Sequence, residues 1–131
     1  MRPIRRTIVQ FCIAIICFVF SLGCNLSDDT KRLPGGHTYV NEGHCYKYIL
    51  VNIKDGPNIE SCVLEFKYDD NYITVAQIDE IKCEQSTPIN TKDKKFFIID
   101  TKKEKLLGPF THLDFKVKFG ELHISEILSL E

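Results

Sequence analysis

The chain has 131 residues, of which 44% are hydrophobic, and its 17 basic and 18 acidic residues give a net charge of −1. A chain of this length forms one domain with a modest core and is too short for two. The absence of a basic excess argues against nucleic-acid binding, which requires positive charge along the phosphates.

The N-terminus has the pattern of a secretory signal. Arg2, Arg5 and Arg6 precede an apolar run, from Ile8 to Phe20, in which only Gln10 is polar. The 16 residues from Ile8 to Gly23 would span about 24 Å as a helix, less than a comfortable membrane crossing of about 20 residues needs. We therefore expect a signal helix in residues 1–23 that is removed on export. The alternative is an uncleaved N-terminal membrane anchor.

Cys24 follows directly after this signal. Ser21-Leu22-Gly23 suits ordinary cleavage, and Ser21 to Cys24 also resembles the bacterial lipobox, whose cysteine carries acyl chains. We expect lipidation of Cys24, and so an exported domain held on a membrane of the cell envelope through those chains. Without lipidation the protein would be secreted. Residues 24–36 are then expected to form a polar tether, and residues 37–131 a single α+β domain. The mature part carries 14 basic and 18 acidic residues.

Six cysteines are present, and Cys12 and Cys17 lie in the apolar signal. If Cys24 is acylated, Cys45, Cys62 and Cys83 form an odd set. Cys62 and Cys83 flank a predicted hairpin, so we favour a disulfide between them. A Cys45–Cys62 pair and buried free thiols are the alternatives. None of these cysteines has the Cys-x-x-Cys spacing of redox or zinc motifs.

Strand signals dominate the first half of the mature chain. Residues 46–51 are rich in strand formers, and 63–68 and 72–78 are joined by the turn Asp69-Asp70-Asn71. Opposing Tyr68 to Ile73 predicts a hairpin with a common apolar face. That face would comprise Leu64, Phe66, Ile73 and Val75.

The second half opens with a polar stretch, residues 79–94, which reads as a long exposed loop. Residues 95–100 (Lys-Phe-Phe-Ile-Ile-Asp) are almost wholly apolar, which predicts a central strand covered on both faces. Residues 111–120 fit either a strand by alternation or a helix capped by Thr111 and ended at Gly120. Ile124 to Leu130 reads as a short strand or an extended tail.

Candidate reactive groups do not converge along the sequence. His37, His44, His112 and His123 lack the spacing of metal ligands on a helix. Asp69 and Asp70 are acidic neighbours, but their place in a turn favours a backbone role over acid–base chemistry. The tyrosines at 39, 46, 48, 68 and 72 could form an adhesive face, although a core role is the simpler interpretation. No catalytic residue, metal or cofactor is expected.

Several stretches together resemble a known family. They are the run from Val63 to Ile73, then Val75-Ala76-Gln77, then Phe96 to Asp100 leading to Gly108-Pro109-Phe110 and Phe115. Over roughly residues 60–130 the chain is similar to an uncharacterised family of small bacterial lipoprotein domains. The resemblance implies a helix after the Gly-Pro pair. It also implies a compact fold and an envelope location. With the strand signals above, the expected fold is an α+β domain, an antiparallel meander of four to five strands with one C-terminal helix. The resemblance implies no activity.

These observations favour a non-enzymatic envelope lipoprotein whose sheet and 79–94 loop bind another protein. The alternative is an inhibitor or immunity-type protein that blocks an envelope hydrolase, with Glu84, Ser86 and Thr87 entering the active-site cleft. A small enzyme is the least favoured reading, because no titratable groups converge by spacing.

Overall fold

The computed structural model describes residues 29–85 and 87–131. The strands are β1 (Asp29–Arg32), β2 (Thr38–Asn41), β3 (Lys47–Leu50), β4 (Val63–Tyr68), β5 (Tyr72–Gln77), β6 (Lys95–Asp100) and β7 (Lys105–Phe110). The helices are α2 (Glu80–Glu84) and α3 (His112–Glu121), with short 3₁₀ turns η1 (Pro34–Gly36), η2 (Thr91–Asp93) and η3 (Glu126–Leu128). The predicted signal helix and Cys24 lie outside the described residues. Within the described ranges, no helix is both long enough and apolar enough to cross a membrane.

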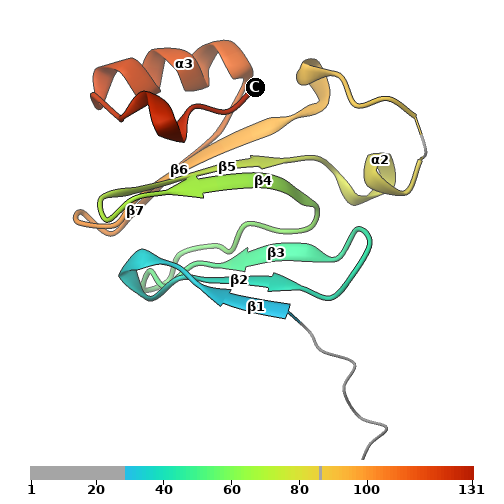
Figure 1. Cartoon of the computed structure of the whole chain (residues 1–131), viewed down its shortest axis with the longest axis horizontal. Helices are drawn as coiled ribbons and strands as arrows, with labels where there is room; N and C mark the ends of the chain where they lie inside the picture. Colours follow the sequence, from blue (N-terminus) through green and yellow to red (C-terminus); the bar gives the residue numbers. More distant parts are fainter. Residues whose placement is uncertain (1–28, 86) are drawn as a thin grey trace, which may run out of the picture.

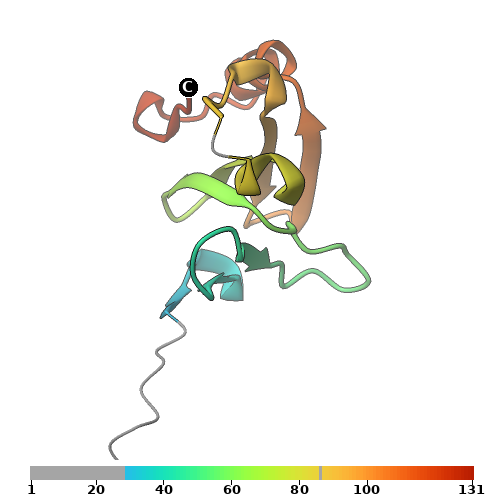
Figure 2. The ribbon, with the colours of Figure 1, turned by 90° about the vertical axis from the view of Figure 1, so that its right-hand side faces the viewer.

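The strands form two antiparallel sheets. One has three strands in the order β1-β2-β3, and the other has four in the order β4-β5-β6-β7. Because hydrogen-bonded neighbours are also neighbours in sequence, each sheet is a simple meander. The sheets lie face to face, and α3 covers the far side of the four-stranded sheet (Figures 1 and 2). The α+β class and the C-terminal helix are thus confirmed, but the single meander of four to five strands is wrong.

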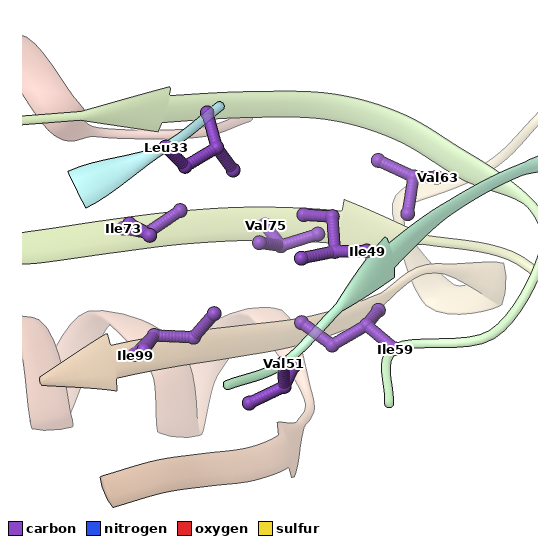
Figure 3. Packing of buried hydrophobic residues seen from close by; sticks show 8 residues of the cluster. All are labelled: Leu33, Ile49, Val51, Ile59, Val63, Ile73, Val75 and Ile99. Carbon is purple, nitrogen blue, oxygen red and sulfur yellow. The ribbon is translucent and has the colours of Figure 1, made fainter. Parts of the chain in front are cut away.

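Aliphatic side chains fill the space between the sheets. We call this set the inter-sheet core: Leu33, Ile49, Val51, Ile59, Val63, Ile73, Val75 and Ile99 (Figure 3). Ile49 also exchanges two backbone hydrogen bonds with Ile59, of 2.9 and 3.0 Å. This bridge guides the chain from β3 toward β4, so the sheets share both a core and a connection.

A second core lies between the four-stranded sheet and α3. We call it the helix core: Ala76, Phe96, Ile98, Phe115, Phe119, Ile124, Leu128 and Leu130. In β6, Ile98 belongs to the helix core and Ile99 to the inter-sheet core, because successive side chains of a strand point to opposite faces. The prediction of a central strand covered on both faces is confirmed.

The β4–β5 hairpin has the predicted register, with Tyr68 opposite Ile73 and Phe66 opposite Val75. Asp69 Oδ1 closes the turn by accepting hydrogen bonds from the amides of Asn71 and Tyr72, both at 2.8 Å. The expected position of Leu64 is wrong. A bulge between Val63 and Glu65 moves it out of register, so that Val63 is buried while Leu64 is exposed.

Residues 112–121 form a helix rather than a strand. Thr111 is its N-cap, and its side chain accepts a hydrogen bond from the Asp114 amide at 3.2 Å. Phe115 and Phe119 lie one turn apart and are both buried against the sheet. Gly108 and Pro109, which precede this helix, belong to β7. Gly108 has φ +113°, and a Cβ there would lie 2.6 Å from the Phe96 carbonyl oxygen, so glycine is required at this bulge.

Three other segments differ from expectation. Residues 29–36 belong to the fold instead of a tether, because β1 pairs with β2 from Asp29 onward. All four residues of β1 are exposed. A polar edge strand has no alternation of apolar residues, so the sequence pattern does not predict it. The 79–94 segment contains α2 and η2 rather than being wholly loop. The C-terminal tail forms η3 and packs on the sheet through Leu128 and Leu130.

Candidate functional site

Three cysteines meet at one end of the two sheets. Cys45 lies in the β2–β3 connection, Cys62 directly precedes β4, and Cys83 is in α2. Their sulfur atoms all lie within 4.8 Å of one another. We call Cys45, Cys62 and Cys83 the cysteine cluster.

Local backbone structure holds each member in place. Gly43 and His44 both have positive φ, and the Tyr46 amide donates to the Gly43 carbonyl at 2.9 Å, so the β2–β3 connection turns tightly. Cys62 exchanges two backbone hydrogen bonds with Ile78, of 2.9 and 3.0 Å. The first turn of α2 then presents Cys83, whose amide donates to the Asp79 carbonyl at 3.1 Å.

Cys45 and Cys83 form a disulfide with a Cα–Cα distance of 5.8 Å. Cys62 is a buried free thiol, 3.0 Å from the Cys83 sulfur. The expected Cys62–Cys83 pair is therefore wrong, although its two sulfur atoms are neighbours. The β2–β3 connection comes within reach of α2 only after the two sheets have packed, and such a long-range approach leaves no mark on cysteine spacing.

Burial raises the pKa of the Cys62 thiol, and the nearby Glu80 carboxylate raises it further. The Lys47 ammonium acts in the opposite direction but does not overcome the loss of hydration. Cys62 therefore remains protonated at neutral pH, which makes it a poor nucleophile there.

Three clustered sulfur atoms suggest a site for a soft metal ion. Such a site requires thiolates, and the disulfide removes Cys45 and Cys83 as thiolate ligands. Only Cys62 remains, and one thiolate does not make a structural metal site. In this state the cysteine cluster contains one thiol and one disulfide, which are the two reactants of thiol–disulfide exchange.

His37 is a buried polar residue that directly precedes β2 of the three-stranded sheet. Its Nδ1 accepts a hydrogen bond from the Asn52 amide at 2.9 Å, which requires that this nitrogen carry no proton. Desolvation lowers the pKa of the ring. His37 therefore serves the fold as a neutral acceptor.

The predicted tyrosine positions divide between core and surface. Tyr39 packs on Phe66 with ring centroids 4.6 Å apart, and Tyr72 contacts the helix core. Tyr46 and Tyr68 are exposed. Tyr68 also stacks on Phe66, with ring centroids 6.4 Å apart, whereas Tyr72 lies on the helix core, so the tyrosines do not form one aromatic face. In the 79–94 segment, Glu84 and Thr87 are exposed, and Ser86 lies outside the described residues.

Two aliphatic side chains are exposed on the outward side of α3. Leu113 is 72% exposed and Val117 56% exposed, and their four-residue spacing places them side by side. Gly120 lies on the same side, one turn further, with open space around its Cα. We call these three residues the α3 face. A surface hollow of about 360 Å³ adjoins it, lined by Thr91, Lys92, Lys94, Thr111, His112 and Leu113.

The four-residue spacing of Leu113 and Val117 places them on one side of a helix, but the spacing by itself gives that side no function. A helix covering a sheet normally exposes polar residues, so two neighbouring exposed aliphatic side chains were the available signal.

Comparison with protein families assigns the chain without assigning an activity. The model of the family described as "Protein of unknown function (DUF3997)" matches residues 39–131, most of the described part of the chain. The predicted membership of an uncharacterised family is thereby confirmed, and the match begins earlier than the expected residue 60. No curated protein and no solved structure is significantly similar to the chain. The chain belongs to the DUF3997 family of proteins of unknown function.

Proposed function

We propose that this chain is a non-enzymatic domain of the cell envelope that binds another protein through the α3 face. The observation that carries the proposal is the paired exposure of Leu113 and Val117, at 72% and 56%. Full burial of a Leu or Val side chain contributes about 1.5–3 kcal/mol, so this small face would supply a useful part of a binding energy.

The hollow beside the α3 face defines the chemistry of the partner. Lys92 and Lys94 line it, while Leu113 belongs to both the hollow and the face. An apolar protein surface with an acidic side chain at its edge matches this arrangement, since the carboxylate would meet Lys92 as the apolar part covers Leu113 and Val117. Lys94 already donates to the Glu131 main-chain oxygen.

The position of the proposed anchor supports this orientation. From Cys24 to Asp29, where β1 begins, the chain reaches at most about 18 Å. β1 lies at the opposite end of the molecule from α3 (Figures 1 and 2). A domain held by acyl chains on Cys24 would therefore sit close to the lipid and present the α3 face away from it.

Photo-crosslinking in the envelope tests the binding surface. A photoreactive amino acid at Val117 is expected to give a discrete protein adduct, which the Leu113→Glu variant weakens. The matched control carries the same amino acid at Ile81 of α2, which is exposed by the same 72% as Leu113. The absence of an adduct at 117, or identical adducts at both positions, would contradict the proposal.

The anchor is tested separately by the intact mass of the mature protein from membranes. Lipidation predicts a chain beginning at Cys24 and carrying acyl groups. A mature chain with an unmodified Cys24, or a retained signal, would show that the domain is held in another way.

The inhibitor hypothesis draws on the contacts that hold the described parts of the 79–94 segment. The disulfide at Cys83, a Lys82–Asp93 ion pair and a Lys95–Asp79 ion pair of 2.7 Å hold it in place. Preorganised loops bind clefts with a lower entropic cost. Inhibition of a lysozyme by the mature chain, weakened by Glu84→Ala and unchanged by Leu113→Glu, would favour this function over the first.

A further inference from the structure

The cysteine cluster places a thiol beside a disulfide without joining them. The Cys62 sulfur lies 3.0 Å from the Cys83 sulfur, while Cys83 is bonded to Cys45. Thiol–disulfide exchange begins when a thiolate attacks one sulfur of a disulfide. Reacting atoms held about 3–3.5 Å apart are already in near-attack range.

We propose that the cysteine cluster is an internal thiol–disulfide exchange site in which Cys62 displaces Cys45 from Cys83. Cys62 first loses its proton to solvent. Its sulfur lone pair forms the Cys62–Cys83 bond, and the Cys45–Cys83 bond breaks. The bonding pair leaves with Cys45, which takes up a proton. One disulfide and one thiol are present before and after, so the step requires no oxidant or reductant.

The two disulfide isomers differ in what they join. The Cys45–Cys83 bond fastens the β2–β3 connection of the three-stranded sheet to α2. A Cys62–Cys83 bond would join the start of β4 to α2, both in the half of the chain that follows β3. Exchange therefore removes the disulfide cross-link between the three-stranded sheet and α2 and leaves the packing of the two sheets to the inter-sheet core.

Burial and the neighbouring charged groups of Cys62 set the rate of thiol–disulfide exchange. Glu80 of α2 and Lys47 of β3 act on the thiol with opposite signs, and Tyr39 of β2 is coupled to it electrostatically. Since burial keeps the thiol protonated, exchange is slow at neutral pH and accelerates as pH rises. Below the Cys62 pKa, the rate should rise about tenfold per pH unit because the thiolate is the attacking species.

Irreversible labelling of the folded, full mature chain tests the exchange. The protein is incubated with iodoacetamide at pH 6 and pH 9 without reductant, then digested without reduction and sequenced by mass spectrometry. The expected product at pH 9 is a chain labelled on Cys45 with a Cys62–Cys83 bridge. Cys62→Ser is the control and should retain Cys45–Cys83 without label. Labelling of Cys62 alone, with Cys45–Cys83 intact, would overturn the proposal.

The Cys45→Ser variant provides a second test. In a glutathione redox buffer, it should form the Cys62–Cys83 bridge under conditions in which Cys62→Ser forms Cys45–Cys83. Circular dichroism verifies that both variants are folded. Two free thiols in folded Cys45→Ser would show that the exchanged isomer is inaccessible and would also overturn the proposal.

Discussion

The four-stranded sheet is covered by a second sheet on one face and by α3 with the C-terminal tail on the other. Between the sheets the core is aliphatic, whereas the helix side buries three phenylalanine rings. The disulfide, the Cys62 thiol and buried His37 all belong to the sheet-to-sheet side or its end. The α3 face lies on the other side. The cysteine cluster and buried His37 are thus separated from the α3 face, and each can be changed independently.

The helix side should be the most sensitive to truncation. Phe115 is 1% exposed and stacks on Phe96 with ring centroids 5.0 Å apart. Phe115→Ala should lower the free energy of unfolding by about 3–5 kcal/mol, measured by urea denaturation, because it leaves a large cavity. Val117→Ala, on the opposite side of the same helix, should change it by less than about 0.5 kcal/mol. Equal effects would show that α3 does not pack as described.

The disulfide should contribute measurably to holding the three-stranded sheet against the rest of the fold. It closes a loop with a sequence separation of 38 residues. In a Cys62→Ser background, adding Cys83→Ser should cost about 2–4 kcal/mol, mostly by enlarging the unfolded ensemble. Using that background prevents a substitute bridge to Cys62. Unchanged stability would mean that Cys45–Cys83 does not form in solution.

His37 should make the three-stranded half acid-sensitive. Its folded-state pKa is lowered, so the unfolded chain binds the proton more readily. The contribution of neutral His37 is complete above the ordinary histidine pKa of about 6.5 and is lost as pH falls from there through the lowered folded-state pKa. Unfolding free energies between pH 7.5 and 5 should decline more steeply in the wild type than in His37→Gln. Parallel pH profiles would contradict this role.

Removal of the α3 N-cap should give the smallest change in the free energy of unfolding. Thr111→Ala removes the side chain that accepts from the Asp114 amide and should cost about 1 kcal/mol. Thr111→Ser keeps the hydroxyl and should restore most of the loss. If serine is no better than alanine, the cap bond contributes little and α3 is held by its two buried phenylalanines.

Local signals in the sequence predicted the β4–β5 hairpin, strand β6 and the start of α3. The Asp69 turn, the register of Tyr68 with Ile73 and the Thr111 cap depend on neighbouring residues, so they can be recognised before the fold is known. The apolar run in β6 predicted burial on both faces for the same reason. The displacement of Leu64 by a bulge is also local, but alternation gives no sign of it.

The formation of β1 and of the cysteine cluster depends on contacts between segments that are distant in the sequence. β1 is polar and fully exposed, and it is a strand only because β2 offers it hydrogen bonds. Cys45 reaches Cys83 only when the two sheets are stacked. The spacing of Leu113 and Val117 places them on one side of a helix. Their exposure, however, depends on which side of α3 packs against the sheet.

Amide hydrogen exchange on oxidised and reduced protein tests the central claim most directly, namely that the disulfide fastens a three-stranded sheet to a half with its own core. Reduction should accelerate exchange at the amides of Val40 and Ile49, in β2 and β3, while Val75 and Ile98 of β5 and β6 remain protected. Equal acceleration in both sheets, or none in β2 and β3, would contradict the account.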